Sequence, residues 1–102
     1  MSEALSFRGR PVRESKRNGR KVRYVADQLV VKLKSRFLND SKAQRKVVEV
    51  LPRKSNLARG FDETGMAIIN LPKSADLFQV ARKLEKQDEV QFAEPNFVDS
   101  GS

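Results

Sequence analysis

The sequence predicts an α+β domain with the element order β-α-β-β-α-β. This order is typical of the ferredoxin-like fold, in which a four-stranded antiparallel sheet carries two helices on one face. Three observations predict it: two segments alternate apolar and polar residues, two carry apolar residues at helical spacing, and turn or cap residues separate them. The 102 residues suffice for one small domain with a modest core.

Two of the four strands are predicted by a clear alternation with a period of two. Residues 27–34 place Leu29, Val31 and Leu33 on one side, and residues 65–71 do the same with Ala67, Ile69 and Leu71. Weaker strands are expected at residues 56–61 and 90–93. A turn over residues 62–65 joins two of these strands, because its Gly permits a tight backbone.

Both helices are predicted from an apolar stripe that follows a capping residue. The first begins at Asp40 or Ser41 and runs to about Leu51. The second has Ser74 as its predicted N-cap and Asp76 in its first turn, where a carboxylate complements the helix dipole. The stripes consist of Ala43, Val47, Val48 and Leu51 in the first helix and of Leu77, Val80, Ala81 and Leu84 in the second.

Charge divides the chain into a basic arm and a nearly balanced domain. The net charge is +8, and residues 1–23 contribute +6 of it. Because this segment has almost no apolar periodicity, we expect a flexible basic arm. Such an arm is a solvated tail, a contact for nucleic acid or another anionic surface, or a targeting or docking segment. Residues 24–98 are the expected folded domain, and residues 99–102 are its C-terminal tail.

The residue types exclude most catalytic chemistry. Without His or Cys, the chain can form neither a Ser-His-Asp triad, nor a Cys-His pair, nor a thiolate metal site. No paired-carboxylate motif, phosphate-binding loop or metal-ligand spacing is present, so we expect no enzyme activity, no cofactor and no metal. The sequence contains neither a membrane-span-like apolar run nor a visible signal peptide. We therefore expect no membrane partner, and a cytoplasmic protein unless an export signal has been removed, in which case it is secreted.

Three segments carry a resemblance to a known family. Residues 24–34 read Tyr-Val-Ala-Asp-Gln-Leu-Val-Val-Lys-Leu-Lys, and residues 84–90 combine a helix end with an acidic pair and Val. The most specific segment is residues 90–98, which read Val-Gln-Phe-Ala-Glu-Pro-Asn-Phe-Val. Over about residues 24–98, the chain resembles the propeptides of subtilisin-like serine proteases.

The resemblance implies an intramolecular chaperone and a tight, product-like inhibitor of the protease domain. The open face of the sheet would pack against two adjacent protease helices, and Glu94 and Asn96 would cap the N-termini of those helices. Val90 and Phe92 are expected to anchor the last strand in the core. An extended tail would enter the substrate cleft, and it comprises Phe97, Val98, Asp99, Ser100, Gly101 and Ser102.

The tail departs from the family pattern at one position. Matching the tail length of the family puts Ser102 next to the cleaved bond. Asp99 then occupies a position at which the family prefers an apolar side chain. A shift of one or two residues would place Val98 or Phe97 there instead.

Two other functions remain open on the sequence. A stand-alone inhibitor of a subtilisin-like protease would have the same fold and contacts, so the expected partner is a protease catalytic domain in cis or in trans. An RNA-recognition-like domain shares the element order, but such domains stack bases on aromatics of two central strands. Residues 28–34 and 65–71 contain no aromatic, so nucleic acid is not the expected partner. We expect the free protein to be a monomer.

Overall fold

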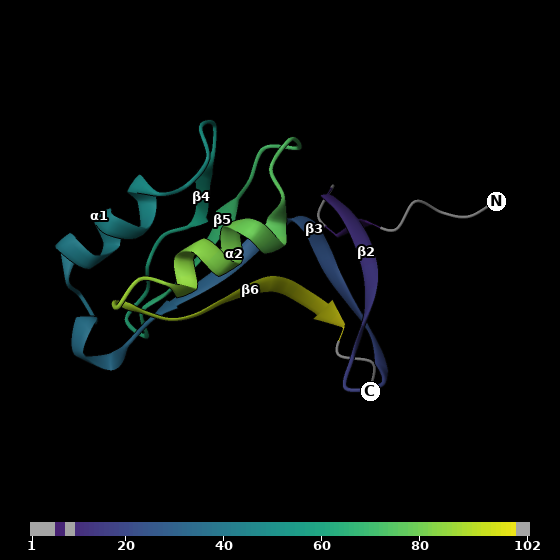
Figure 1. Cartoon of the computed structure of the whole chain (residues 1–102), viewed down its shortest axis with the longest axis horizontal. Helices are drawn as coiled ribbons and strands as arrows, with labels where there is room; N and C mark the ends of the chain where they lie inside the picture. Colours follow the sequence, from purple (N-terminus) through teal and green to yellow (C-terminus); the bar gives the residue numbers. More distant parts are fainter. Residues whose placement is uncertain (1–5, 8–9, 100–102) are drawn as a thin grey trace.

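The computed structural model describes the backbone of residues 6–7 and 10–99 and the side chains of residues 10–98 (Figure 1). It shows β-strands, a single turn of 3₁₀-helix and two α-helices. In chain order the elements are β1 (Ser6–Phe7), β2 (Arg10–Arg17), β3 (Arg20–Leu33), η1 (Ser35–Phe37), α1 (Ser41–Glu49), β4 (Asn56–Arg59), β5 (Met66–Asn70), α2 (Leu77–Glu85) and β6 (Val90–Asp99).

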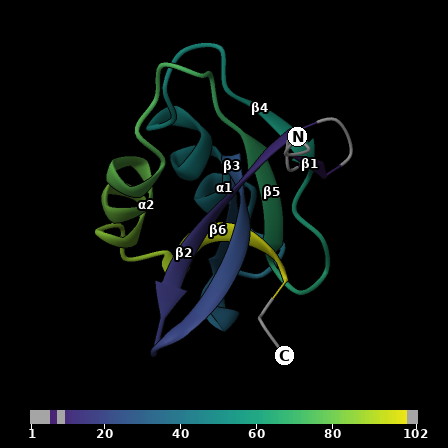
Figure 2. The ribbon, with the colours of Figure 1, turned by 90° about the vertical axis from the view of Figure 1, so that its right-hand side faces the viewer.

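An antiparallel sheet is built around β3. The second half of β3 pairs with both β5 and β6, its first half pairs with β2 and with the end of β6, and β4 pairs with β5. The two α-helices lie on the same side of this sheet (Figure 2). The predicted α+β class and the two helices are thereby confirmed. The described residues form a six-stranded sheet instead of the expected four strands, because residues before 24 also form strands.

The predicted apolar stripes meet in one core between the sheet and the helices. All four stripe residues of α2 are buried, as are the alternating apolar residues of β3 and β5. In α1 only Ala43 and Val47 are buried, whereas Val48 is 45% exposed and faces solvent. The largest fully buried side chains are Leu29, Leu33, Ile69, Leu84, Val25, Val31 and Val47.

Both α-helices begin after an aspartate. The side chain of Asp40 accepts hydrogen bonds from the N–H groups of Lys42 and Ala43, as the sequence predicts. Asp76 caps α2 in the same way, so the prediction of Ser74 as the cap is wrong. The reason is that α2 starts only at Leu77, which leaves Ser74 in the preceding turn.

The turn between β4 and β5 is where the sequence places it. The side chain of Asp62 accepts hydrogen bonds from the N–H groups of Thr64 and Met66. Gly65 has a φ of +81°, and a Cβ at this position would come within 2.5 Å of the side chain of Leu38. The positive φ favours Gly here, whereas the flexible end of the Leu38 side chain could move aside.

The basic segment expected as a flexible arm is a β-hairpin from residue 10 onward. β2 pairs with the first residues of β3 from Val12↔Val25 to Arg17↔Arg20. Asn18 and Gly19 form the two-residue connection and have φ values of 54° and 78°. Positive φ at both central residues is typical of a type I′ hairpin turn, for which Asn-Gly is a preferred pair. Residues 1–5 of the expected arm lie outside the described residues.

β6 is longer than expected and continues to Asp99. Pro95 lies opposite Leu29 and Asn96 lies opposite Val25, so the three residues of β3 between these two pairs have no partner in β6. Pro95 supplies no N–H for pairing, which suits a position at such an irregularity. The first half of the strand supports the helix-covered core, and the second half runs on along the hairpin.

The expectation for Val90 holds, but the one for Phe92 does not. Val90 is 3% exposed and lies opposite Leu33 in the core. Phe92 lies opposite Lys32 and is half-buried on the opposite face. A register shift between Lys32 and Leu33 separates the two residues, so the simple alternation that would place them on one face is broken.

Candidate functional site

The face of the sheet that the helices do not cover carries a half-buried apolar centre. In the first cross-strand row, Val30 lies opposite Ile68 and Glu94. In the next row, Lys32 lies opposite Met66 and Phe92. We call this surface the open face, and it comprises Val30, Lys32, Met66, Ile68, Phe92 and Glu94, all of intermediate exposure.

Lys32 is charged, but its ammonium group lies off the centre of the open face, so that centre stays apolar. Its Nζ donates hydrogen bonds to the backbone oxygens of Leu33, at 3.2 Å, and Thr64, at 3.0 Å. The ammonium group is thereby held by the turn before β5, while the aliphatic stem stays on the sheet. Contiguous apolar surface of this kind is typical of an interaction site.

Glu94 lies on the open face at the side of β6. Its side chain is 37% exposed, and its Oε1 lies 3.6 Å from Nη2 of Arg17 at the end of β2. A carboxylate at this position presents acceptors next to the apolar centre. It is accessible to a partner, as the sequence-based assignment of a capping role requires.

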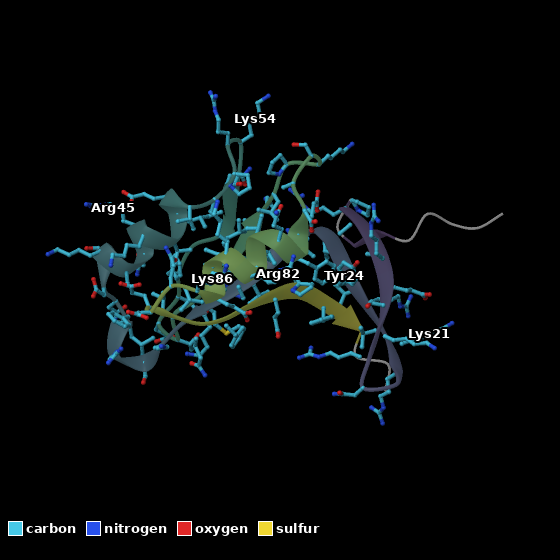
Figure 3. The ribbon with its side chains drawn as sticks, viewed as in Figure 1. Lys21, Tyr24, Arg45, Lys54, Arg82 and Lys86 are labelled. Carbon is cyan, nitrogen blue, oxygen red and sulfur yellow. The ribbon has the colours of Figure 1, made fainter. Side chains whose placement is uncertain are left out.

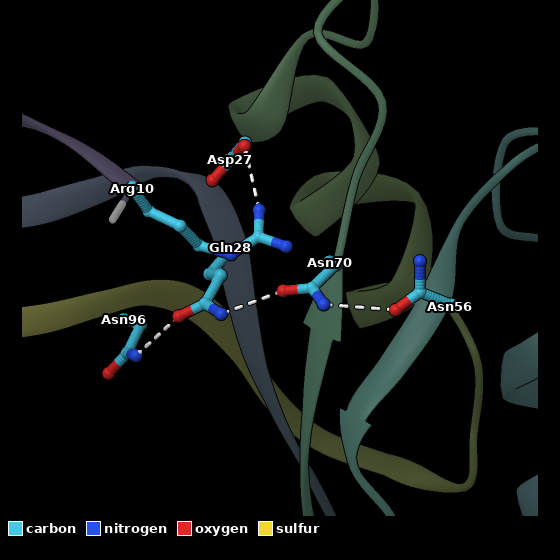
Figure 4. A network of polar contacts seen from close by, with 6 residues as sticks. All are labelled: Arg10, Asp27, Gln28, Asn56, Asn70 and Asn96. Atoms are coloured by element: carbon cyan, nitrogen blue, oxygen red, sulfur yellow. Dashed lines mark hydrogen bonds and ion pairs between the residues drawn. The ribbon is translucent and has the colours of Figure 1, made fainter. Parts of the chain in front are cut away.

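Asn96 stands at one end of a row of four amide side chains that crosses β6, β3, β5 and β4 (Figure 4). Its Nδ2 donates to Oε1 of Gln28 at 2.9 Å. Nε2 of Gln28 donates to Oδ1 of Asn70 at 2.7 Å, and Nδ2 of Asn70 donates to Oδ1 of Asn56 at 2.9 Å. We call these four residues the amide ladder.

The amide ladder determines which atom of Asn96 is presented outward. All its hydrogen bonds run in the same direction, so the NH₂ group of Asn96 is used within the domain. Its carbonyl oxygen points away from Gln28 (Figure 4). Gln28 at the centre is only 9% exposed, which makes these bonds stronger than they would be in water. The ladder therefore uses one N–H of Asn96 and leaves its carbonyl oxygen available to accept a hydrogen bond.

The start of the predicted tail is part of β6. Phe97 lies opposite Tyr24, and their rings meet edge to face with centroids 6.3 Å apart. Val98 is half-buried, and the backbone of Asp99 pairs with Arg23. Ser100, Gly101 and Ser102, which the sequence also assigns to the tail, lie outside the described residues.

The structure adds residues that the sequence-based site does not contain. Gln28 and Asn70 hold Asn96, whereas Arg17 and Tyr24 contact Glu94 and Phe97 from the hairpin. The Asn-Gly pair at the hairpin turn is the signal that could have predicted the hairpin contacts. No comparable signal exists for the ladder, because polar residues on the outer face of a strand are ordinary.

Among the described groups with clearly shifted pKa values, Asp62 lies in the turn that borders the open face, whereas Glu89 and Lys46 lie away from that face. The pKa of Glu89 is lowered, chiefly by a hydrogen bond from Lys46, and the same contact raises the pKa of Lys46. The pKa of Asp62 is lowered, chiefly by the hydroxyl of Thr64. The contact between Lys46 and Glu89 ties α1 to the start of β6, and the contact between Asp62 and Thr64 closes a turn, so both contacts stabilise the fold. In the part of the chain that the structure describes, no cluster of three or more acidic residues could hold a metal ion.

Comparison with known proteins identifies the family. The family described as the fervidolysin N-terminal prodomain matches residues 10–96. The chain belongs to the fervidolysin N-terminal prodomain-like family. This confirms the resemblance to propeptides of subtilisin-like proteases, and it places the chain among regulatory regions of proteases, not among their catalytic domains. No curated protein and no solved structure matched the chain.

The extent of the match bears on the hairpin. It begins at Arg10, so it includes β2 and the turn, which the sequence-based resemblance over residues 24–98 leaves out. The hairpin is therefore part of the prodomain pattern. None of the helices among the described residues is long and apolar enough to cross a membrane.

Proposed function

We propose that this chain is the propeptide of a subtilisin-like serine protease, in cis or in trans, and that it inhibits the catalytic domain and assists its folding. The observation that carries the proposal is the open face, where an apolar centre adjoins two outward acceptors, Glu94 and Asn96. Two adjacent helices on the protease would cover the apolar centre. Their unpaired first N–H groups would meet the two acceptors.

The fold suits such a contact. We propose that β3, β4, β5 and β6 together with the two helices form a ferredoxin-like unit, to which the hairpin is added. In such a unit the helices bury one face of the sheet and leave the other for a partner. Protease–inhibitor complexes bury about 1,600 Å², which fits inhibition in the nanomolar to micromolar range.

The tail supplies the second contact. We propose that residues of the segment from Phe97 to Ser102 occupy the substrate cleft like a product. Phe97 is already packed against Tyr24 and Arg17. This favours the registers in which Val98 or Asp99 takes the position that prefers an apolar side chain. Binding only to the native-like protease would also stabilise it, which is the physical basis of folding assistance.

The test is an inhibition assay with the full chain and the cognate subtilisin-like catalytic domain. Replacing Glu94 and Asn96 together by Ala should weaken inhibition about 30-fold, because each lost cap costs about 1 kcal/mol and the pair therefore about 2 kcal/mol. Gln91→Ala is the matched control, since Gln91 is exposed on the same strand. Removal of residues 98–102 should weaken inhibition further and leave the circular dichroism spectrum unchanged. A wild-type chain that leaves the protease fully active would refute the proposal.

Folding assistance needs a separate measurement. Denatured catalytic domain should recover more activity when it is refolded with the chain and the chain is then removed by proteolysis. The variant lacking both acceptors should give a smaller yield at the same concentration, because linkage scales with affinity. Equal yields with and without the chain would show that inhibition is its only role.

A further inference from the structure

The hairpin meets β6 at the point where the proposed tail begins. The same segment of β3 pairs with β2 on one side and with Asn96 to Asp99 on the other. Tyr24 lies at the centre of this junction and is 8% exposed. Its ring contacts Phe97 of β6 and also Phe78 of α2, with centroids 5.7 Å apart in the second pair. The junction therefore ties the hairpin, the tail and α2 together.

Arg17, at the end of β2, contacts two of the residues that the proposed function places against the protease. Its guanidinium carbon lies 4.8 Å from the centre of the Phe97 ring, which is within cation–π range. Its Nη2 lies 3.6 Å from Oε1 of Glu94. One side chain thus connects the carboxylate proposed to cap a protease helix with the aromatic residue that begins the proposed tail.

We propose that the hairpin is a clasp that holds the start of the tail in an extended strand before the protease binds, with Arg17 as a positioning residue. This inference rests on the proposed function. An extended segment that is not tied down is usually poorly ordered, and ordering it on binding reduces affinity. The clasp removes that cost for Phe97 and its neighbours.

The clasp is compatible with the cap at Glu94. A carboxylate has two oxygens, and the 3.6 Å contact with Arg17 is made by Oε1. Oε2 can accept a hydrogen bond from a helix N–H group while Arg17 stays in place. Arg17 therefore orients Glu94 for the protease without competing for the whole group.

The first test needs no partner protease. Chymotrypsin cleaves after Phe97 when the tail leaves β3, and mass spectrometry separates this cut from cuts elsewhere. In the full chain, Arg17→Ala should raise the cleavage rate at Phe97 about three- to tenfold, given the size of an exposed cation–π contact and ion pair. Cleavage after Phe61, at the far side of the domain, should not change. Equal rates at Phe97 would overturn the clasp.

A matched control on the same hairpin separates charge from contact. Lys21→Ala removes the same charge, but Lys21 points outward from the hairpin (Figure 3) and should leave cleavage at Phe97 unchanged. Gly19→Val loosens the hairpin turn without altering any side chain at the junction, and it should raise cleavage as Arg17→Ala does. If Lys21→Ala accelerates cleavage as much as Arg17→Ala, net charge and not the clasp is responsible.

The second test links the clasp to the protease. Arg17→Ala should weaken inhibition of the catalytic domain by a factor similar to its effect on cleavage. Arg17→Lys should restore part of it, because the charge near Glu94 is kept while the planar contact with Phe97 is lost. Tighter inhibition by Arg17→Ala would overturn the proposal, since the clasp would then compete with the cleft. A wild-type chain without inhibition would refute the proposed function, whereas the chymotrypsin result reports on the clasp itself.

Discussion

The part of the domain that the two helices cover, which we call the body, and the β2–β3 hairpin are stabilised in different ways. The body buries regular apolar stripes, and residues such as Leu29 and Leu84 are fully buried in it. The hairpin spans residues 10–23 with seven Arg or Lys and one Glu, and apart from Val22 its side chains are at least partly exposed. A two-stranded hairpin is at best marginally stable in water. The hairpin therefore depends on its turn and on its junction with the body.

The largest expected effect comes from the body. Leu29→Ala should lower the free energy of unfolding by about 2–5 kcal/mol, because it opens a cavity among fully buried side chains. Val48→Ala is the control: Val48 is 45% exposed and should cost little. Urea denaturation followed by circular dichroism measures both. A loss below about 0.5 kcal/mol for Leu29→Ala would contradict the view that burial specifies the body.

The amide ladder offers a test on the open face of the body. Gln28→Leu keeps the size of the side chain but leaves polar atoms of Asn70 and Asn96 without their partner, which should cost about 1–3 kcal/mol. It should also weaken protease inhibition nearly as much as Asn96→Ala does. Asn56→Ala removes only the last, exposed member of the ladder and is the control. Full inhibition by Gln28→Leu would show that the ladder does not orient Asn96.

The hairpin can be perturbed alone through its turn. Gly19→Val should cost about 1–2 kcal/mol locally, because a β-branched residue resists the left-handed conformation at φ +78°. Amide hydrogen exchange should accelerate in β2 and in the first residues of β3 while α2 and β5 keep their protection. Gly60→Ala is the control, since it has no positive φ and no atom near its Cβ position. Loss of protection throughout the body would mean that the two regions fold as one unit.

This contrast explains what could be predicted from the sequence. The strands at Leu29–Leu33 and Ala67–Leu71 and the stripe of α2 bury residues with strict periodicity, so pattern alone predicts them. The first half of β3 and all of β2 are rich in Arg and Lys, and their pairing depends on the Asn18-Gly19 turn. The basic composition favours an arm more strongly than two turn residues favour a hairpin, so the sequence predicts an arm where the structure has a strand.

The candidate site follows the same division. Glu94 and Asn96 were predicted through the resemblance, and both lie where a partner can reach them. Their orienting contacts with Arg17 and Gln28 arise between residues 77 and 68 positions apart in the chain. Such contacts depend on how the strands are ordered and registered, so no local pattern predicts them. The face of Phe92 was missed for a related reason, because a bulge reversed the alternation.

The smallest effect concerns an ion pair at the far end of the body from the hairpin. Nζ of Lys46 in α1 lies 2.7 Å from Oε2 of Glu89, just before β6. The hydrogen bond from Lys46 lowers the pKa of Glu89, and the same bond raises the pKa of Lys46. The folded domain thus binds the proton of Glu89 more weakly than the unfolded chain does. The ion pair therefore contributes to the free energy of unfolding at pH values above the unfolded pKa of Glu89. It is lost as the pH falls through the lower, folded pKa.

Lys46→Met tests this contribution against the hairpin. The variant should be less stable than the wild type at neutral pH, and the gap in stability should close as the pH falls through the lowered pKa of Glu89. It should also close in strong alkali as the pH rises through the raised pKa of Lys46. Urea denaturation across pH measures the gap, and Lys42→Met on the same helix is the control. Cleavage at Phe97 should be unchanged in Lys46→Met at neutral pH, because the clasp shares no contact with this ion pair. A stability difference between Lys46→Met and the wild type that does not change with pH would show that Lys46 acts through packing instead.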